Sequence, residues 1–267
     1  MSAFHGPFQA TVLGVAESAA NLESALPEDL GPARRTSPAE RLGAIAEVVL
    51  CSGFPTQLLL VTVMTAAGMQ FRTAEGHWSP VFVSVLSLLD TALVVGLIVL
   101  FLTSHRERPR DVLIGTRDPW REVIVGVGLL PVVFGLAVLI LAALYLSMPQ
   151  LHNVPRNPLE DMLQNRRDAV MFGTVAIIAG GVREEIQRGF ILHRFRQYLG
   201  GSAVGIVVYS VAFGLGHIDQ GWDAAIAVAS LGAIWGTIYV IRRSVIAPMV
   251  SHAGFNLAQV IKFIALR

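Results

Sequence analysis

Seven apolar stretches of the chain are each about as long as a helix that crosses a bilayer. A membrane-spanning helix needs about 20 mainly apolar residues, and it pairs its own backbone N–H and C=O groups where no water is available. The pattern therefore predicts an all-α fold, a multi-pass transmembrane helical bundle with about seven spans. The stretches lie near residues 42–69, 79–103, 122–148, 168–192, 202–219, 223–241 and 245–265.

The composition favours a membrane protein in contact with a lipid bilayer and argues against a nucleic-acid partner. Hydrophobic residues make up 54% of the 267 residues and charged residues only 15%, whereas a soluble domain carries about 25% charged residues. The formal net charge is +1, and the basic residues form short clusters between apolar runs, so no nucleic-acid-binding face is expected. The single cysteine, Cys51, excludes a disulfide within the chain.

The sequence predicts two parts, a soluble N-terminal tail over residues 1–40 and a transmembrane domain over residues 41–267. The tail has mixed charges and lacks the basic start, apolar core and cleavage site of a signal peptide. Ser37, Pro38 and Glu40 form a helix-start signature, with serine as the N-cap and glutamate at the third helical position. We expect the first membrane helix to begin there.

Arginines indicate how the predicted spans are oriented. They are concentrated in alternate connections, which should be cytoplasmic because short loops on that side carry an excess of Lys and Arg. This predicts a cytoplasmic N-terminus, and the presence of a single lysine, Lys262, points to a bacterial cytoplasmic membrane. The arginines of these connections are Arg34, Arg35, Arg41, Arg106, Arg108, Arg110, Arg117, Arg121, Arg194, Arg196, Arg242 and Arg243.

Ionisable side chains inside the apolar stretches are the strongest functional signal, because such groups are costly in lipid and usually functional. In the fourth stretch Glu184 and Arg188 are four residues apart and share a helical face, whereas Glu185 points about 100° away. One carboxylate can therefore pair with the arginine while the other acts as a base. A structural ion pair at a helix end is the alternative interpretation.

The fifth and seventh stretches add His217, His252 and Asn256. His217 closes its stretch after two glycines, while His252 and Asn256 are four residues apart and project from one helical face. The latter two can bind a developing oxyanion or coordinate a metal ion. Taken singly, these residues also fit an interfacial histidine and polar contacts between helices.

Together the three stretches supply a carboxylate base, two imidazoles and an amide, the groups needed to activate water against a peptide bond. One possibility is a zinc ion, with His217 and His252 as candidate ligands, which would lower the pKa of bound water to about 7. The other possibility is metal-free, with a glutamate and one histidine activating water. The second histidine and Asn256 would then stabilise the oxyanion. The sequence leaves both open.

These motifs resemble the CPBP family of intramembrane proteases, the CAAX prenyl endopeptidase and bacteriocin-processing group also called Abi. The resemblance covers residues 168–265, the expected protease-like core. It implies an all-helical endopeptidase whose site opens toward the cytoplasm and cleaves a peptide or membrane-protein substrate near the cytoplasmic membrane surface. The motifs are Glu184 and Glu185 with Arg188, Gly189 and Phe190, then Phe213 with His217, then His252 with Asn256.

The first motif departs from the family pattern. The family places three residues between the glutamate pair and the arginine, whereas this chain has only Ile186 and Gln187. An ungapped match on Arg188 puts Arg183 at the first, catalytic glutamate and Glu184 at the second. Either the pair has shifted by one position and stays active, which two upstream glycines favour because they tolerate a helix distortion, or the base is missing.

Two other functions fit the same residues. A proton- or ion-coupled transporter would use the buried acids, arginines and histidines as a relay, although no repeated pair of broken helices is visible. A non-catalytic scaffold, such as an immunity or regulatory protein of the same fold, would explain the altered first motif. Asp90, an acid in the second stretch, is either part of a water route to the site or a structural partner for a buried arginine or hydroxyl.

Overall fold

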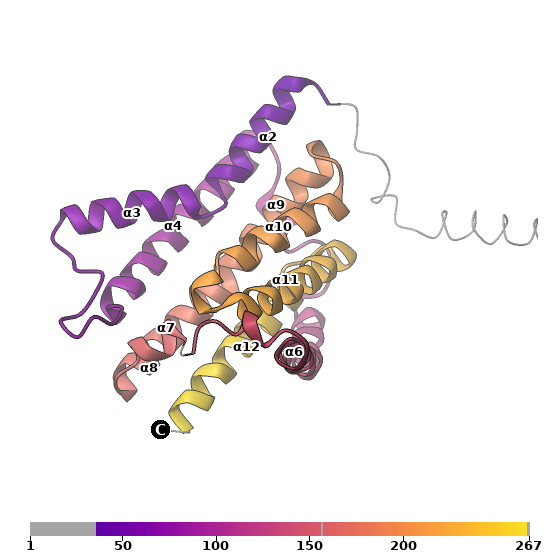
Figure 1. Cartoon of the computed structure of the whole chain (residues 1–267). Coiled ribbons are helices and arrows are strands. Elements are labelled where there is room, and N and C mark those ends of the chain that lie inside the picture. The colour runs from indigo at the N-terminus through magenta and orange to yellow at the C-terminus, as the bar shows by residue number, and fades with distance from the viewer. Residues whose placement is uncertain (1–35, 156, 266–267) are drawn as a thin grey trace, which may run out of the picture.

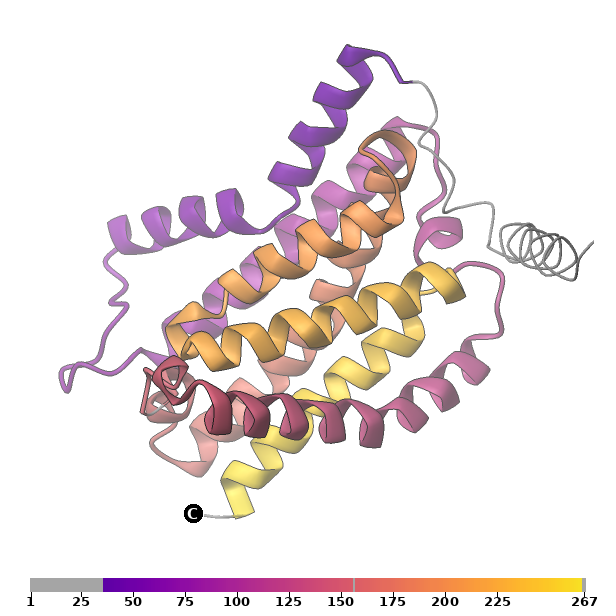
Figure 2. The same cartoon turned by 45° about the vertical axis from the view of Figure 1, so that its right-hand side comes forward.

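The computed structural model describes residues 36–155 and 157–265, and within these ranges it contains helices and one isolated β-bridge, between Arg72 and Trp78. The all-α prediction is confirmed for this part of the chain. The helices form one bundle, with the first two lying along its side (Figures 1 and 2). Residues 1–35, most of the predicted soluble tail, lie outside the described residues.

Helices occupy all seven predicted stretches, and the fourth stretch contains three helical segments in succession. The elements are α2 (Pro38–Leu50), α3 (Phe54–Ala66), α4 (Pro80–Ser104), α5 (Pro109–Leu113), α6 (Pro119–Ser147), η2 (Pro149–Leu151), α7 (Pro158–Met162), α8 (Arg166–Val175), η3 (Ala176–Arg183), α9 (Glu184–Tyr198), α10 (Ser202–Leu215), η4 (Ile218–Gln220), α11 (Trp222–Arg242) and α12 (Ile246–Ala265).

Not every described helix is long enough to cross a membrane. By length and hydropathy α4, α6 and α11 can each do so, and α2 with α3 passes the same test as one span bent by 44°. Helix α10 is apolar but has only 14 residues, about 21 Å at 1.5 Å per residue, which is less than the roughly 30 Å hydrocarbon core. The helical bundle is therefore confirmed, whereas seven full crossings remain a prediction.

The start of α2 follows its predicted signature. The Ser37 side chain accepts a hydrogen bond from the backbone N–H of Glu40, and the Glu40 carboxylate accepts one from the backbone N–H of Ser37 at 2.8 Å. Pro38 occupies the first turn, where its missing N–H has no intrahelical partner to lose. The reciprocal bonds satisfy two donors that a helix start leaves open, so local sequence fixes where this helix begins.

A break separates α2 from α3 at Gly53. Gly53 has a φ of +82°, a left-handed conformation that glycine adopts without steric cost. Pro55 follows in the first turn of α3, where proline is tolerated. The Gln187 side chain of α9 donates a hydrogen bond to the backbone carbonyl of Cys51 at 2.7 Å, so α9 satisfies a carbonyl group at the break.

Helix α9 lies at the centre of the bundle. It packs against α2, α4, α5, α10 and α11, and each residue from Gln187 to Phe195 is buried. Large apolar side chains instead lie exposed on the outer faces of the surrounding helices, as expected for lipid contact. The charged residues of α9 therefore face protein. Examples of the exposed side chains are Leu58, Leu59, Val138, Leu139 and Val207.

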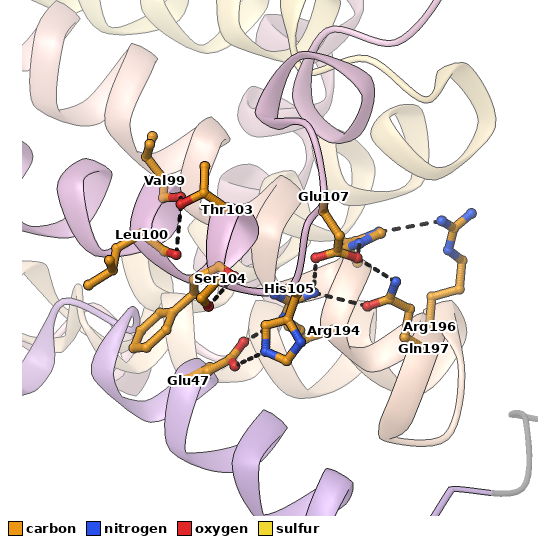
Figure 3. A network of polar contacts seen from close by, with 12 residues as sticks. Glu47, Val99, Leu100, Thr103, Ser104, His105, Glu107, Arg194, Arg196 and Gln197 are labelled. Atoms are coloured by element: carbon orange, nitrogen blue, oxygen red, sulfur yellow. Dashed lines mark hydrogen bonds and ion pairs between the residues drawn. The ribbon is translucent and has the colours of Figure 1, made fainter.

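At its C-terminal end α9 is tied to α2 and to the connection after α4 (Figure 3). Arg194 is fully buried and donates to Glu47 at 2.6 Å and to Glu107 at 2.5 Å. His105 contacts the other carboxylate oxygen of Glu47 at 2.6 Å. We call the following residues the Arg194 network: Glu47, His105, Glu107, His193, Arg194 and Gln197.

Glu107 has partners at both of its carboxylate oxygens. One oxygen contacts His193 at 2.7 Å and accepts a hydrogen bond from Gln197 at 2.6 Å, and the other accepts from Arg194. Burial disfavours the charged carboxylate, but the hydrogen bonds outweigh it and lower the pKa of Glu107 to about 2. The network thus holds three elements together by charges that each have a partner.

Candidate active site

The helix that carries the glutamate pair changes its winding just before the pair. Helix α8 continues into the π-helix η3, and α9 then begins at Glu184. A Cβ at Gly180 would lie 2.5 Å from Nδ2 of Asn256, and one at Gly181 would lie 2.5 Å from Cβ of Ala253, so both glycines are needed for α12 to pack this closely. Turns of π-helix are rare in proteins overall, and those that do occur often lie at functional sites. The sequence indicated that these glycines would tolerate a helix distortion, and η3 is such a distortion.

Glu185, rather than Glu184, is the partner of Arg188. Its Oε1 accepts a hydrogen bond from the Arg188 guanidinium and another from Nδ1 of His252 at 2.8 Å. The side chains of Glu185 and Arg188 are each only 1% exposed. Sequence spacing placed Glu184 on the same helical face as Arg188. The observed pair is Glu185 with Arg188, three residues apart on the helix. His252 from α12 contacts the Glu185 carboxylate as well.

Aromatic rings surround the Arg188 guanidinium on the sides away from Glu185. Its central carbon lies 4.8 Å from the ring centre of Phe213, 5.3 Å from that of Tyr209 and 5.6 Å from that of Trp235. Cations are attracted to the faces of such rings, and more strongly when water is absent. The rings and Glu185 together explain how a fully buried arginine is tolerated here.

Glu184 faces a cavity of about 440 Å³ that His217, His252 and Asn256 also line. The Glu184 side chain is 19% exposed, and its Oε2 lies 3.9 Å from Nε2 of His252, too far for a direct hydrogen bond. The cavity therefore brings together four of the six candidate residues, from α9, α10 and α12. The remaining two, Glu185 and Arg188, do not line the cavity.

His217 reaches the cavity because α10 is short. The helix ends at Leu215, and Nδ1 of His217 contacts the backbone carbonyl of Phe213 at 2.8 Å. Nδ1 is then the protonated nitrogen of the neutral ring, an assignment made from its acceptor, and Nε2 carries a lone pair. A full-length fifth span would place His217 at the far membrane surface. A helix of about 21 Å is shorter than a full crossing, so His217 follows it before such a crossing would be complete.

His252 is held on three sides. Its ring stacks on Trp235 with centroids 3.9 Å apart and planes 16° from parallel, and Phe213 approaches it edge-on. Its Nδ1 contacts the Glu185 carboxylate, which can only accept, so Nδ1 carries the proton and Nε2 is left with a lone pair. Trp235 of α11 thus packs against α12, and it fixes the plane of this imidazole.

Asn256 links α12 to the π-helix. Its Nδ2 donates a hydrogen bond to the backbone carbonyl of Ala176 at 3.2 Å. In a π-helix the carbonyl groups are displaced from the usual pattern, so this amide satisfies an acceptor in the distorted segment. The amide has two N–H groups, and the second one remains available to the cavity that Asn256 lines.

Residues 166–258 match the family model described as type II CAAX prenyl endopeptidase, Rce1-like. This match supports membership of the CPBP family for that part of the chain. The matched Rce1-like domain begins at the first residue of α8 and ends within α12, and it contains all six candidate residues. The predicted family resemblance is therefore confirmed. No curated protein and no solved structure matches the chain.

The donors of the Rce1-like domain do not form a ready metal site. Among residues 36–155 and 157–265, no three His, Cys, Asp or Glu side chains lie together so that they could hold a metal ion. Zinc sites usually take three or four such ligands. The arrangement of Glu184, His217 and His252 therefore does not fit zinc without movement, and the metal-assisted possibility stays a proposal to be tested.

Two features of the site were not foreseen from the sequence. One is the backbone carbonyl of Ala176 as a partner of Asn256, which depends on a π-helix that the glycines indicate only in general terms. The other is the wall contributed by α7 through residues such as Leu159 and Glu160. The acidic, proline-initiated segment of α7 is not an apolar stretch, so a search for spans passes over it.

The cavity extends from the Rce1-like motifs toward one end of the bundle. Asn157, Gln220 and Lys262 line it in addition to the candidate residues. These belong to the start of α7, to η4 and to the last turns of α12, and Figure 1 shows α7 and the C-terminal end of α12 on the side away from the start of α2. The cavity thus leads away from the Arg194 network.

Proposed function

We propose that the chain is an intramembrane endopeptidase that hydrolyses a peptide bond in the cavity of its Rce1-like domain. One observation carries the proposal. The Glu184 carboxylate and the Nε2 atoms of His217 and His252 all present lone pairs to one cavity inside an apolar helical bundle. These three acceptor atoms face the cavity instead of a protein donor, so their convergence indicates a site built for a reacting molecule.

In the proposed reaction Glu184 is the general base. A water molecule bound between the Glu184 carboxylate and Nε2 of His252, which are 3.9 Å apart, gives a proton to Glu184. The water oxygen forms a bond to the carbonyl carbon of the substrate, and the carbonyl π electrons move to oxygen. When this intermediate collapses, the C–N bond breaks and Glu184 passes its proton to the leaving nitrogen. One water is consumed, and a carboxylic acid and an amine are released.

His217 and Asn256 are proposed to stabilise the negative charge on the former carbonyl oxygen. His217 donates from Nε2 after that nitrogen binds a proton from solvent, which returns to solvent after product release, and its Nδ1 remains bonded to the Phe213 carbonyl throughout. Asn256 donates through the N–H that Ala176 does not use. Donors that are already in place when charge develops are worth about 10²–10³ in kcat for each one removed. The π-helix thus contributes by holding Asn256.

Glu185 is proposed to orient His252 rather than to touch the substrate. Its carboxylate fixes which ring nitrogen carries the proton, as the carboxylate of a catalytic triad does. Arg188 pairs with the same carboxylate and holds it in place. Activity is thereby proposed to reside in Glu184, the second position of the family motif in an ungapped match, so the shortened motif would still provide a base.

The direction from which the substrate enters follows from the cavity and can be measured. The arginine-rich connections are expected in the cytoplasm, and the family resemblance implies a site that opens to the cytoplasm. The cavity leads away from Arg194, which is one of those arginines. The arginine-rich side and the side on which the site opens therefore cannot both be cytoplasmic. In a Cys51→Ser background, Asn157→Cys should react with a membrane-impermeant maleimide from the side of entry, with Arg108→Cys as the control for the opposite side.

The function is tested by comparing protein termini in membranes of cells that carry the wild type or Glu184→Gln at equal abundance. A protease predicts new N-termini that appear with the wild type and are absent with the variant, and those termini identify the substrate. Repeating the assay on purified protein with and without a chelator tests metal assistance. Identical sets of termini would favour the scaffold function, for which Glu184 is dispensable.

A further inference from the structure

A second buried ion pair lies behind the catalytic helix and has no part in the reaction as proposed. Asp90 on α4 is completely buried and pairs with Arg183, the last residue of η3. This confirms the interpretation of Asp90 as a structural partner of a buried arginine. Arg183 also occupies the position where an ungapped family match would place the first glutamate, and it directly precedes Glu184 in the chain.

Asp90 is positioned by hydrogen bonds from the broken first span. Thr56 donates from its hydroxyl to Oδ1 of Asp90, and Gln57 donates to Oδ2 at 3.2 Å. Both donors lie in the first turn of α3, directly after the break at Gly53. The bend between α2 and α3 therefore presents two donors to a single carboxylate at the level of η3.

Arg183 is enclosed by the same elements. Besides Asp90, its guanidinium donates to Gln187 at 3.0 Å, and a Cβ on Gly53 would lie 3.3 Å from its Nη2. Arginine cannot lose its proton under ordinary conditions, so its charge always needs an anion or water. Asp90 is the carboxylate that now supplies the anion, and it holds the guanidinium on the α4 side of η3.

The nearest carboxylate along the chain is the one proposed as the base. Glu184 follows Arg183 directly and has no hydrogen bond to hold it among the residues that the structure describes. If Asp90 lost its charge, the buried guanidinium would be left without an anion, and Glu184 could supply one. The base would then be drawn out of the cavity and its lone pairs would be occupied.

We propose that Asp90 is a positioning residue of the site, which keeps the Arg183 charge away from Glu184 and so leaves Glu184 free to bind water. The proposal rests on the proposed function for its catalytic readout. It explains why a chain with arginine in the first glutamate position also carries an acid in its second apolar stretch. It also assigns a role to the broken α2–α3 segment, which orients Asp90.

The test uses a difference between Asp90 and Arg183: a carboxyl group can become neutral by binding a proton, whereas a guanidinium group stays charged. Asp90→Asn leaves an arginine that cannot become neutral, and kcat should fall about 100-fold with KM nearly unchanged, as for a misplaced catalytic group. Arg183→Gln removes the competing charge and leaves a carboxyl group, which can bind a proton; kcat should stay within about tenfold of wild type. The double variant should recover to the level of Arg183→Gln.

A purely structural clamp predicts different results. Its loss would lower the melting temperature of both single variants, and the double variant would be no more active than Asp90→Asn. That outcome, or wild-type activity in Asp90→Asn, overturns the proposal. If Asp90→Asn does not fold, Arg183→Gln decides alone, because a loss near 100-fold in that variant contradicts a role for Arg183 as a mere competitor.

A second readout does not depend on hydrolysis. Dicyclohexylcarbodiimide, an apolar reagent for carboxyl groups, should label Glu184 in the purified wild type, which peptide mass spectrometry detects and Glu184→Gln abolishes. Asp90→Asn should lose this label because Arg183 pairs with Glu184, and the double variant should regain it. Equal labelling of wild type and Asp90→Asn overturns the inference. A wild type that labels as expected but cleaves nothing would instead overturn only the proposed function.

Discussion

The two ends of α9 carry the same kinds of charged side chains but differ in whether those side chains have hydrogen-bond partners. At the C-terminal end, both oxygens of Glu47 and of Glu107 have partners, with Arg194 joining the two acids. At the N-terminal end, one oxygen of Glu185 contacts both Arg188 and His252, whereas Glu184 faces a cavity without a hydrogen bond. Acids, arginines and histidines therefore indicate a site only where one of them is left without a partner.

The difference has a structural cause. At the Arg194 network, α2 and the connection after α4 both end against α9 and supply a partner for each charge. At the other end, η3 widens the helix, and the missing side chains of Gly180 and Gly181 let α12 pack closely against it. In the described ranges, this close packing brings no charged side chain to pair with Glu184. A saturated cluster stabilises the fold, whereas an unsaturated one can bind water and substrate.

The largest effect should come from Glu184, which faces the cavity and has no hydrogen bond within the described part of the chain. Glu184→Gln removes the proposed base without breaking a hydrogen bond, so kcat should fall about 10³-fold or more while the melting temperature stays close to wild type. Cleavage of a substrate identified from its new terminus, combined with thermal unfolding in detergent, measures both. A large loss of stability would place Glu184 with the saturated residues instead.

Glu185→Gln should show the opposite balance. It leaves the buried Arg188 without its anion, and loss of one partner of a buried pair costs about 3–5 kcal/mol. The aromatic rings around Arg188 offset part of that cost. Unfolding in detergent should therefore shift clearly, with partial activity at low temperature. An unchanged unfolding midpoint would show that Glu185 does not stabilise the fold.

A smaller effect should follow from filling the space between η3 and α12. Gly180→Ala places a methyl group where the Asn256 amide now lies, and the displaced amide should lower kcat by about tenfold, less than complete loss of an oxyanion donor. Gly96→Ala on α4 is the matched control, because a Cβ there meets nothing within 4 Å. Equal activities of the two variants would remove Asn256 from the mechanism.

The smallest effect should appear at the Arg194 network under acid. The folded pKa of Glu107, about 2, lies below its ordinary value of 4.5, so the stabilisation by this carboxylate is complete above pH 4.5 and is lost as the pH falls toward 2. The melting temperature of Glu107→Gln should thus decline less than that of wild type across this window. Cleavage at neutral pH should stay the same in both.

Sequence reasoning recovered what depends on local pattern. The capping residues Ser37 and Glu40 fixed the start of α2, the apolar stretches marked the helices, and three spaced motifs indicated the family. Each of these features is decided by residues within a few turns of one another. The adjacent glycines before Glu184 likewise indicated that a distortion is tolerated there, although not that it would be a π-helix.

Partners from distant segments could not be assigned in this way. Spacing along a helix favoured Glu184 as the partner of Arg188, but His252 and Arg188 converge on Glu185 only after α12 has packed. Likewise, the pairing of Asp90 with Arg183 spans 93 residues. A charge in one helix says little about which opposite charge it meets. The fifth stretch was predicted to reach residue 219, whereas α10 ends at Leu215 and a separate short helix, η4, begins at Ile218.

The most direct test of the account compares the two neighbouring glutamates on one substrate. Purified wild type, Glu184→Gln and Glu185→Gln are reconstituted in liposomes, and the cleavage rate of the substrate found from new termini is measured at a temperature where all three are folded. The account predicts that Glu184→Gln is at least tenfold slower than Glu185→Gln although it is the more stable variant. A faster Glu184→Gln would contradict the account and assign the base to Glu185.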